Sequence, residues 1–182
     1  AMAIVLSLPE EKREERVDLA DFKTEDIRNI TLKNNSEEWT VVNDNGWIVK
    51  DSKKTDEYAA AEIADRLLKF SGKHIGKETA EDKYGTANPT ATVTYTKNDG
   101  NSLVFRLGNK TPPGTEYYLA DDEKNIYTVY TETGDAMKSR RYMAEDSFIL
   151  GVGYESIDSI TVSGSDAFSL SKGQKSWKFV CK

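Results

Sequence analysis

The chain has 182 residues and a formal net charge of −6. This length fits one domain, or one domain and the start of another, with a core that needs neither a disulfide nor a metal to fold. The acidic balance lacks the clustered Lys and Arg that phosphate contacts require, so we expect no nucleic-acid partner. The single cysteine, Cys181, excludes an intramolecular disulfide and does not decide the compartment.

The first sixteen residues differ in composition from the rest. Residues 4–9 form an apolar run, and residues 10–16 carry mixed charges. A spanning helix needs about 20 apolar residues, so the run is too short to cross a bilayer. We interpret it as the trailing edge of a membrane anchor outside this sequence, or alternatively as a frayed apolar tail. Residues 1–16 are therefore predicted to be a tail and charged spacer.

Residues 17–150 predict one β-rich domain. Apolar and β-forming residues predict strands at 27–32, 39–42 and 47–49, then hairpins pairing 90–96 with 103–107 and 117–120 with 126–130. Helical spacing of apolar residues predicts a main helix over 55–70, which Ser71-Gly72 ends, and a short helical segment over 132–143. The expected class is α+β, mostly antiparallel sheet.

An internal repeat recurs at a separation of about 130 residues. Ile27-x-x-Ile30-Thr31-Leu32 is echoed by Ile157-x-x-Ile160-Thr161-Val162, Trp39-x-Val41 by Phe168-x-Leu170, and Trp47 by Trp177. Residues 151–182 are therefore predicted to start a second repeat unit. Either a helix follows it beyond this sequence, or its strands close the sheet of the first domain.

Several landmarks along the chain together resemble the bacterial domain-of-unknown-function family 4340. They are Ile27 to Val49 with Trp47, Tyr84-Gly85 to Pro89-x-Ala91-Thr92-Val93, Asp99-Gly100, Leu107-Gly108, Thr111-Pro112, Gly114, Tyr117-Tyr118 and Ile126-Tyr127. The resemblance implies a membrane-anchored protein with a β-rich extracytoplasmic region. It also implies an accessory role beside ABC-type transport systems and supplies no catalytic residues.

The motifs of common catalytic and cofactor sites are weak in this sequence. His74, the only histidine, is expected to cap a helix end or face solvent. Four aspartates, Asp44, Asp99, Asp121 and Asp122, fall in predicted turns, where local hydrogen bonding explains them. Gly151-Val152-Gly153 lacks the third glycine of a dinucleotide fingerprint, and 121–125 is too short for a calcium loop. We expect no catalytic residue, cofactor or metal.

Four tyrosines on the second hairpin form the candidate binding surface. Tyr117 and Tyr118 point to opposite faces of a strand, and Tyr127 or Tyr130 lies near one of them across the hairpin. Exposed rings there suit a sugar or a protein partner, whereas cross-strand packing would explain buried ones.

The preferred functional hypothesis is a non-enzymatic extracytoplasmic module, anchored to the cytoplasmic membrane, that binds envelope proteins such as an ABC-type transporter. A glycan- or peptide-binding module using the tyrosines is the first alternative. A hydrolase using two facing carboxylates is the second.

Overall fold

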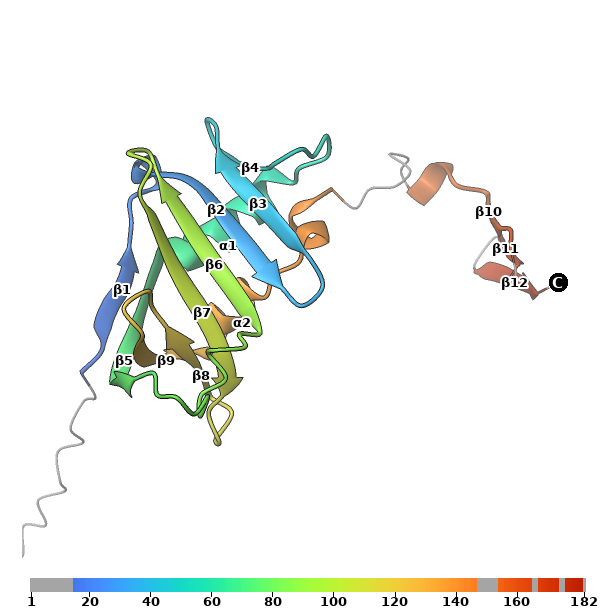
Figure 1. Ribbon diagram of the computed structural model, residues 1–182. Helices are drawn as coiled ribbons and strands as arrows, with labels where there is room; N and C mark the ends of the chain where they lie inside the picture. The colour runs from blue at the N-terminus through green and yellow to red at the C-terminus, as the bar shows by residue number, and fades with distance from the viewer. Residues whose placement is uncertain (1–14, 147–153, 165–166, 174–175, 182) are drawn as a thin grey trace, which may run out of the picture. The chain divides into compact units, whose positions relative to one another are not determined.

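The computed structural model describes residues 15–146, 154–164, 167–173 and 176–181 (Figure 1). The chain divides into two compact units, residues 1–146 and residues 147–182. Each unit has its own antiparallel sheet, so the last strands form a separate sheet and do not extend the first one. Residues 1–14 of the tail and spacer predicted over 1–16, and the predicted boundary between 150 and 151, lie outside the described residues.

The first unit is built on a nine-stranded sheet with the strand order β1-β5-β9-β8-β7-β6-β2-β3-β4. Every neighbouring pair in this sheet is antiparallel. The strands are β1 (Val17–Asp21), β2 (Ile27–Asn34), β3 (Glu38–Asn43), β4 (Trp47–Val49), β5 (Lys69–Lys77), β6 (Ala91–Lys97), β7 (Ser102–Lys110), β8 (Glu116–Ala120) and β9 (Asn125–Tyr130). The predicted hairpins and the α+β class are confirmed.

Two helices lie against one face of this sheet (Figure 1). They are α1 (Glu57–Leu68) and α2 (Thr131–Met137); short 3₁₀ turns η1 (Thr24–Asp26) and η2 (Arg141–Ala144) flank the sheet and α2. The second helical segment was predicted to run over 132–143. It is instead broken between Met137 and Arg141, where Lys138 is no longer helical and Arg140 is extended.

The sequence of α1 explains both its start and its buried side. The Asp56 side chain accepts a hydrogen bond from the Ala59 backbone N–H at 3.0 Å, which caps the first turn. Five apolar residues spaced around one stripe are buried: Ala60, Ile63, Ala64, Leu67 and Leu68. This stripe is the helical contribution to the core.

The predicted end of α1 at Ser71-Gly72 is wrong. The backbone becomes extended at Lys69, and both residues belong to β5. Gly72 serves close packing there, because a Cβ atom would overlap the Leu19 side chain. The glycine signal marked a tight approach between strands and not a helix terminus.

One continuous core joins the helices to the sheet. Residues from β2, β3, β4, β6 and β7 belong to the same buried cluster as the apolar stripe of α1, and the fully buried side chains include Ile30, Leu32, Val41 and Val93. The buried Tyr95 hydroxyl donates to the Leu67 carbonyl oxygen at 2.7 Å, which satisfies the polar atom of a core ring.

The second unit consists of the 3₁₀ turn η3 (Tyr154–Ser156) and the strands β10 (Ser159–Val162), β11 (Phe168–Lys172) and β12 (Trp177–Cys181). Its order, β10-β11-β12, matches that of β2-β3-β4. Ile160 faces Leu170 as Ile30 faces Val41. The predicted internal β-rich repeat is thus confirmed, with the same strand order and register in both copies.

None of the helices in the described part of the chain is both long and apolar enough to cross a bilayer.

Candidate functional site

A groove lies between α1 and the segment α2–η2 of the first unit. Its volume is about 250 Å³, and we call it the helical groove. The residues that line it are Ala59, Glu62, Ile63, Arg66, Asp135, Ala136, Ser139 and Met143.

The α1 wall of the helical groove follows from helix geometry. Ala59, Glu62, Ile63 and Arg66 are spaced by three and four residues, so they form one stripe along the helix. This stripe lies beside the buried one, and Ile63 belongs to both, being 8% exposed. The helix therefore presents a partly apolar side to the groove while its core side stays packed.

The opposite wall is held against the start of α1. The Asp56 backbone N–H donates to the Ala144 carbonyl oxygen at 3.0 Å, and Thr55 forms a bridge with Glu145. These bonds keep η2, and with it Met143, close to the first turn of α1. Backbone hydrogen bonds thus fix the width of the groove at this end.

Large apolar side chains are exposed on two of the elements that form the groove walls. Tyr58 is 81% exposed, Tyr142 64% and Met143 50%. All three lie on α1 or η2, the two elements whose backbones are joined. Aromatic residues and methionine are enriched in protein interfaces, so their clustering on these two elements indicates a contact surface.

Ion pairs border the helical groove. Arg66 pairs with Glu62 at 2.6 Å, and Lys138 pairs with Asp135 at 2.9 Å. Partial burial opposes ionisation of Asp135, but hydrogen bonds from Lys138 and Tyr117 outweigh it and lower the pKa of this carboxyl group. Burial likewise opposes the charge of Lys138, and its bonds to Tyr117 and Asp135 raise its pKa overall. Both groups remain charged near neutral pH.

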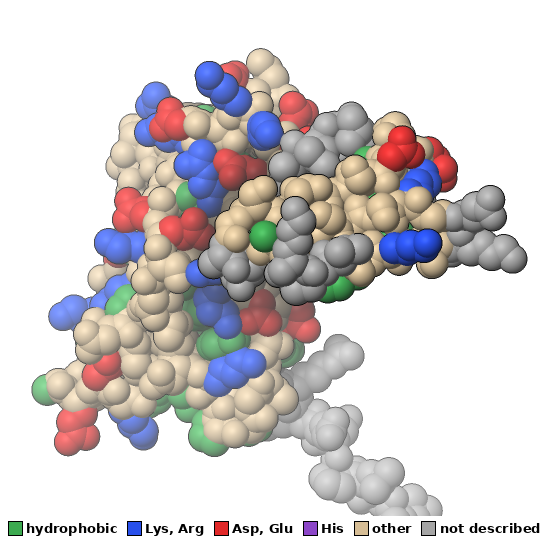
Figure 2. Space-filling model, turned by 90° about the vertical axis from the view of Figure 1, so that its right-hand side faces the viewer, with side chains coloured by type: hydrophobic (Ala, Val, Ile, Leu, Met, Phe, Trp, Pro, Cys, Tyr) green, Lys and Arg blue, Asp and Glu red, His purple; other side chains and the backbone are tan. Residues whose placement is uncertain are grey.

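The four residues Lys138-Ser139-Arg140-Arg141 form a basic run within the predicted helical segment 132–143. It lies instead in the connection from α2 into η2, and its cations are paired with carboxylates: Lys138 with Asp135, Arg140 with Glu37 at 3.9 Å, and Arg141 with Glu145 at 2.9 Å. Figure 2 shows the same mixing of charges over one face of the described residues, where basic and acidic side chains alternate.

Tyr117 and Tyr127 lie on the helix-covered face of the sheet. Tyr117 is buried below α2, where Gly134 leaves room for its ring because a Cβ atom would overlap it. Its hydroxyl donates to Asp135 at 3.2 Å and accepts from Lys138. The Tyr127 hydroxyl donates to Asp121 at 3.2 Å, and burial together with the Asp121 charge raises the pKa of Tyr127. The buried Tyr117 ring is therefore not free to stack on a ligand.

Tyr118 and Tyr130 lie on the opposite, outer face. Tyr118 packs against Tyr84, with ring centroids 4.8 Å apart. Tyr130 is half exposed, and the Arg16 guanidinium lies 3.9 Å from its ring centroid. The strand register places the two tyrosines diagonally across the hairpin, because Tyr118 faces Thr128. The structure therefore separates the four tyrosines into two pairs on two faces.

The sequence predicted that His74 caps a helix end or faces solvent. It lies within β5 and not at a helix end. Its ring meets Tyr127 edge-on with centroids 5.4 Å apart. Of the turn aspartates, Asp99 accepts bonds from Asn101 and Asp121 accepts bonds from Asn125. These carboxylates have the local roles expected of turns. No group of three metal-ligating side chains occurs among the residues that the structure describes.

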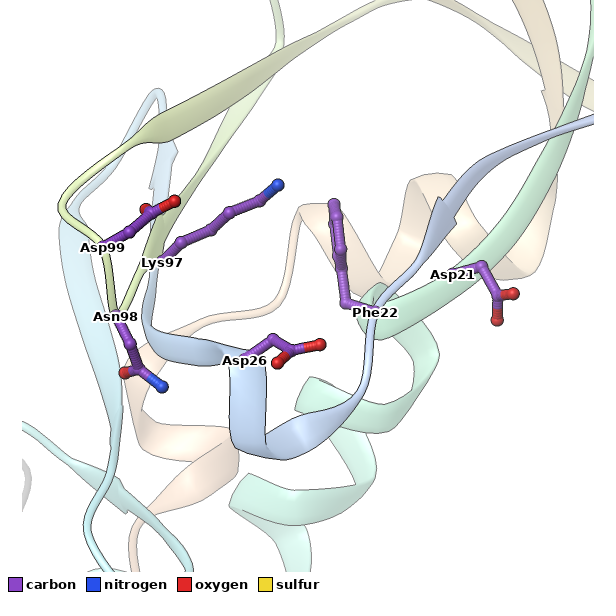
Figure 3. A pocket seen from close by; sticks show the side chains of 6 residues that line it. All are labelled: Asp21, Phe22, Asp26, Lys97, Asn98 and Asp99. Carbon is purple, nitrogen blue, oxygen red and sulfur yellow. The ribbon is translucent and has the colours of Figure 1, made fainter.

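A second depression, of about 300 Å³, lies where the β6–β7 turn meets the segment after β1 (Figure 3). Lys97 extends toward the Phe22 ring, with its Nζ atom 5.4 Å from the ring centroid. The Asp99 carboxylate lies beside the Lys97 side chain. Asp21 points away from Lys97 and pairs with Lys69 at 3.4 Å. The three aspartates of this depression, Asp21, Asp26 and Asp99, therefore do not converge on one point.

The helical groove was not predicted from the sequence. Its α1 stripe mixes small, apolar and charged residues, which reads as an ordinary boundary between core and solvent. The opposite wall exists because the helix ends at Met137, whereas the sequence predicted one continuous helical segment there. The break itself places Ser139 and Met143 in the groove.

The fold and the groove define a β-rich antiparallel module with two helices on one face and a second, smaller sheet after it. The family model described as "Domain of unknown function (DUF4340)" matches residues 68–179. The chain belongs to this family. Comparison with curated proteins and comparison with solved structures gave no match.

Proposed function

We propose that this chain is a non-enzymatic, extracytoplasmic module of a membrane-anchored bacterial protein, which binds a protein of the cell envelope as an accessory subunit, for example of an ABC-type transporter. Family membership supports the coarse class of an uncharacterised module. The helical groove, which Met143 lines, supports protein binding, together with the exposed Tyr58 and Tyr142 on α1 and η2.

The size of the groove carries this proposal. Pockets for whole small molecules commonly have volumes of about 300–1,000 Å³, whereas the helical groove has about 250 Å³. A depression of this size suits one anchoring side chain of a larger partner. Exposed Tyr and Met beside it would add contact area, and the Glu62–Arg66 and Asp135–Lys138 pairs would form the polar rim of such an interface.

The test is crosslinking and purification of the full-length protein from its own membranes, followed by mass spectrometry. The natural protein should recover a defined membrane complex, and Met143→Glu should reduce that recovery at least about tenfold, since a buried charge at an anchor site is costly. Tyr130→Glu is the matched control, because it adds the same charge on the outer face. Recovery of the protein alone, or equal recovery with Met143→Glu, would contradict the proposal.

The proposed location is tested separately. In intact spheroplasts, external protease should cleave the module while a cytoplasmic marker stays whole. Protection of the module until the membrane is lysed would place it on the cytoplasmic side and remove the extracytoplasmic assignment.

Glycan or peptide binding by the tyrosines has weaker support. Tyr130 is the exposed ring, and Arg16 already lies over it. Binding on a glycan array that is lost with Tyr130→Ala would favour this alternative. The hydrolase alternative needs two carboxylates facing a common cleft, and Asp99 and Asp121 are engaged in their own turns.

A further inference from the structure

The two copies of the repeat match more closely in structure than in sequence. At the offset of 130 residues that relates Ile27 to Ile157, η1 at Thr24–Asp26 and η3 at Tyr154–Ser156 occupy equivalent places, so the repeat begins three residues earlier than the sequence echo. The Asn43 side chain donates to the Thr24 carbonyl oxygen at 2.8 Å. The Lys172 side chain, at the position equivalent to Asn43, donates to the Glu155 carbonyl oxygen at 2.9 Å, one residue later in its turn. Each 3₁₀ turn is thus bound by the end of the second strand of its copy.

The register of the third strand is also repeated. Val41 faces Val49, and the equivalent Leu170 faces Phe179. Asn43 faces Trp47, as Lys172 faces Trp177. One face of β10-β11-β12 therefore carries the same apolar positions as the core face of β2-β3-β4. We call it the second apolar face, and it consists of Ile160, Val162, Phe168, Leu170, Trp177 and Phe179.

The two faces differ in burial. In the first copy the positions are 0–4% exposed: Ile30, Leu32, Trp39, Val41, Trp47 and Val49. In the second copy Val162 is 40% exposed and Phe179 is 63% exposed, while the other four are partly buried. The Phe168 and Phe179 rings are neighbours on this face, with centroids 5.5 Å apart. The second apolar face thus has the composition of a core without full cover from the described residues.

The first copy shows what kind of segment covers such a face. The chain leaves β4 at Val49 and forms α1 from Glu57, and this helix packs on β4 and completes the core. Its covering stripe includes two small residues, Ala60 and Ala64, beside the larger Ile63, Leu67 and Leu68. Small residues let the helix lie close to the sheet, where the larger side chains of the strands fill the space.

We infer that the second apolar face binds an amphipathic helix of the α1 type, reached from β12 as α1 is reached from β4. The family match supports treating the strands as part of the common pattern, because it continues from the end of α1 through β10 and β11 into β12. The second unit is then the opening of a second copy of the βββα arrangement. This inference does not depend on partner binding at the helical groove.

The direct test extends the chain with its own helix. The register equates Val49 with Phe179, so Lys182 corresponds to Ser52, and a copy of residues 53–68 appended after Lys182 reproduces the natural connection. Hydrogen exchange of the segment 157–181 should then slow at least about tenfold relative to the unextended chain. Circular dichroism should report added helix.

Two matched controls keep this test decisive. An appended segment of the same composition in scrambled order should give no protection. In the extended chain, Phe179→Ser should abolish the protection without altering exchange in β2-β3-β4, because only the second apolar face loses a contact. Unchanged exchange of 157–181 in the extended chain would overturn the inference. So would protection of the unextended chain that appears with dimerisation in sedimentation velocity, because the face would then pair with a second copy.

Discussion

In the first unit the apolar face of β2, β3 and β4 lies in a continuous core, whereas the matching face of β10, β11 and β12 is partly exposed in the described residues. The register is nevertheless the same in both. Alternation of apolar residues and the turns between strands are enough to set register, since a slip by one residue would reverse the faces. Burial of the face needs a further segment, which local pairing does not supply.

The largest expected difference between the copies is in the stability lost when the isoleucine at equivalent positions is replaced by alanine. Ile30→Ala should lower the free energy of unfolding of the first unit by about 2–5 kcal/mol, because Ile30 is fully buried and a cavity would remain. Ile160→Ala should cost the second unit about 1 kcal/mol or less, since its surroundings are only partly packed. Urea titration followed by segment-resolved hydrogen exchange separates the two units. Equal costs would remove the proposed contrast in packing.

The next prediction concerns tryptophan hydrogen bonding. The Trp39 indole N–H donates to the Ser139 carbonyl oxygen at 3.0 Å, and the equivalent residue of the second copy is Phe168, which has no such donor. Trp39→Phe should therefore destabilise the first unit by about 1–3 kcal/mol beyond the loss of ring volume, because the buried carbonyl loses its partner.

Trp47→Phe is the control for that experiment. The Trp47 indole nitrogen is buried and makes no hydrogen bond within the described part of the chain. The same deletion there should cost only the lost packing. Equal destabilisation by the two variants in chemical denaturation would show that the Trp39–Ser139 bond contributes little.

A smaller effect on stability is expected from the Asp135–Lys138 ion pair, which bonds the Tyr117 hydroxyl in the first unit. The pKa of Asp135 is lowered in the folded state, so its contribution to stability is present above its ordinary value of 3.8 and disappears as pH falls through the folded value. Asp135→Asn should cost less than about 1 kcal/mol at pH 7, because the side chain is 60% exposed and the pair is screened.

The measurement for Asp135 is the unfolding free energy of both proteins at intervals from pH 7 down to pH 2. The difference between them should vanish at the acid end. A difference that stays constant over this range would mean that the carboxylate charge is not its cause.

The smallest effect should come from the Glu62–Arg66 pair on α1. Both side chains are more than half exposed, so Glu62→Gln should change the unfolding free energy by about 0.5 kcal/mol or less. A thermal melt that shifts strongly would show that this pair does more than border the helical groove.

Sequence periodicity predicted the strands, the main helix and the repeat because each depends on neighbours within a few residues. The helix end was misplaced because Gly72 serves close packing against Leu19, Tyr127 and Thr128, which are distant in sequence. Two features of the candidate sites could likewise not be predicted from the sequence. Tyr117 is buried by α2, and the wall containing Met143 exists because the helical segment breaks after Met137. Such contacts arise between elements, so a single strand or helix pattern does not contain them.

Arg16 stands where the first described residues meet the sheet. Its guanidinium binds Glu116 at 2.7 Å and the Thr128 carbonyl oxygen at 3.0 Å, and it lies on the Tyr130 ring. One side chain thus fastens the start of β1 to β8 and β9, which lie farther into the sheet than β5, its own neighbour. A mechanical pull on the preceding residues would reach this clamp before the hydrogen bonds of β1, so tension would be spread over three strands and the edge strand would be kept from peeling away.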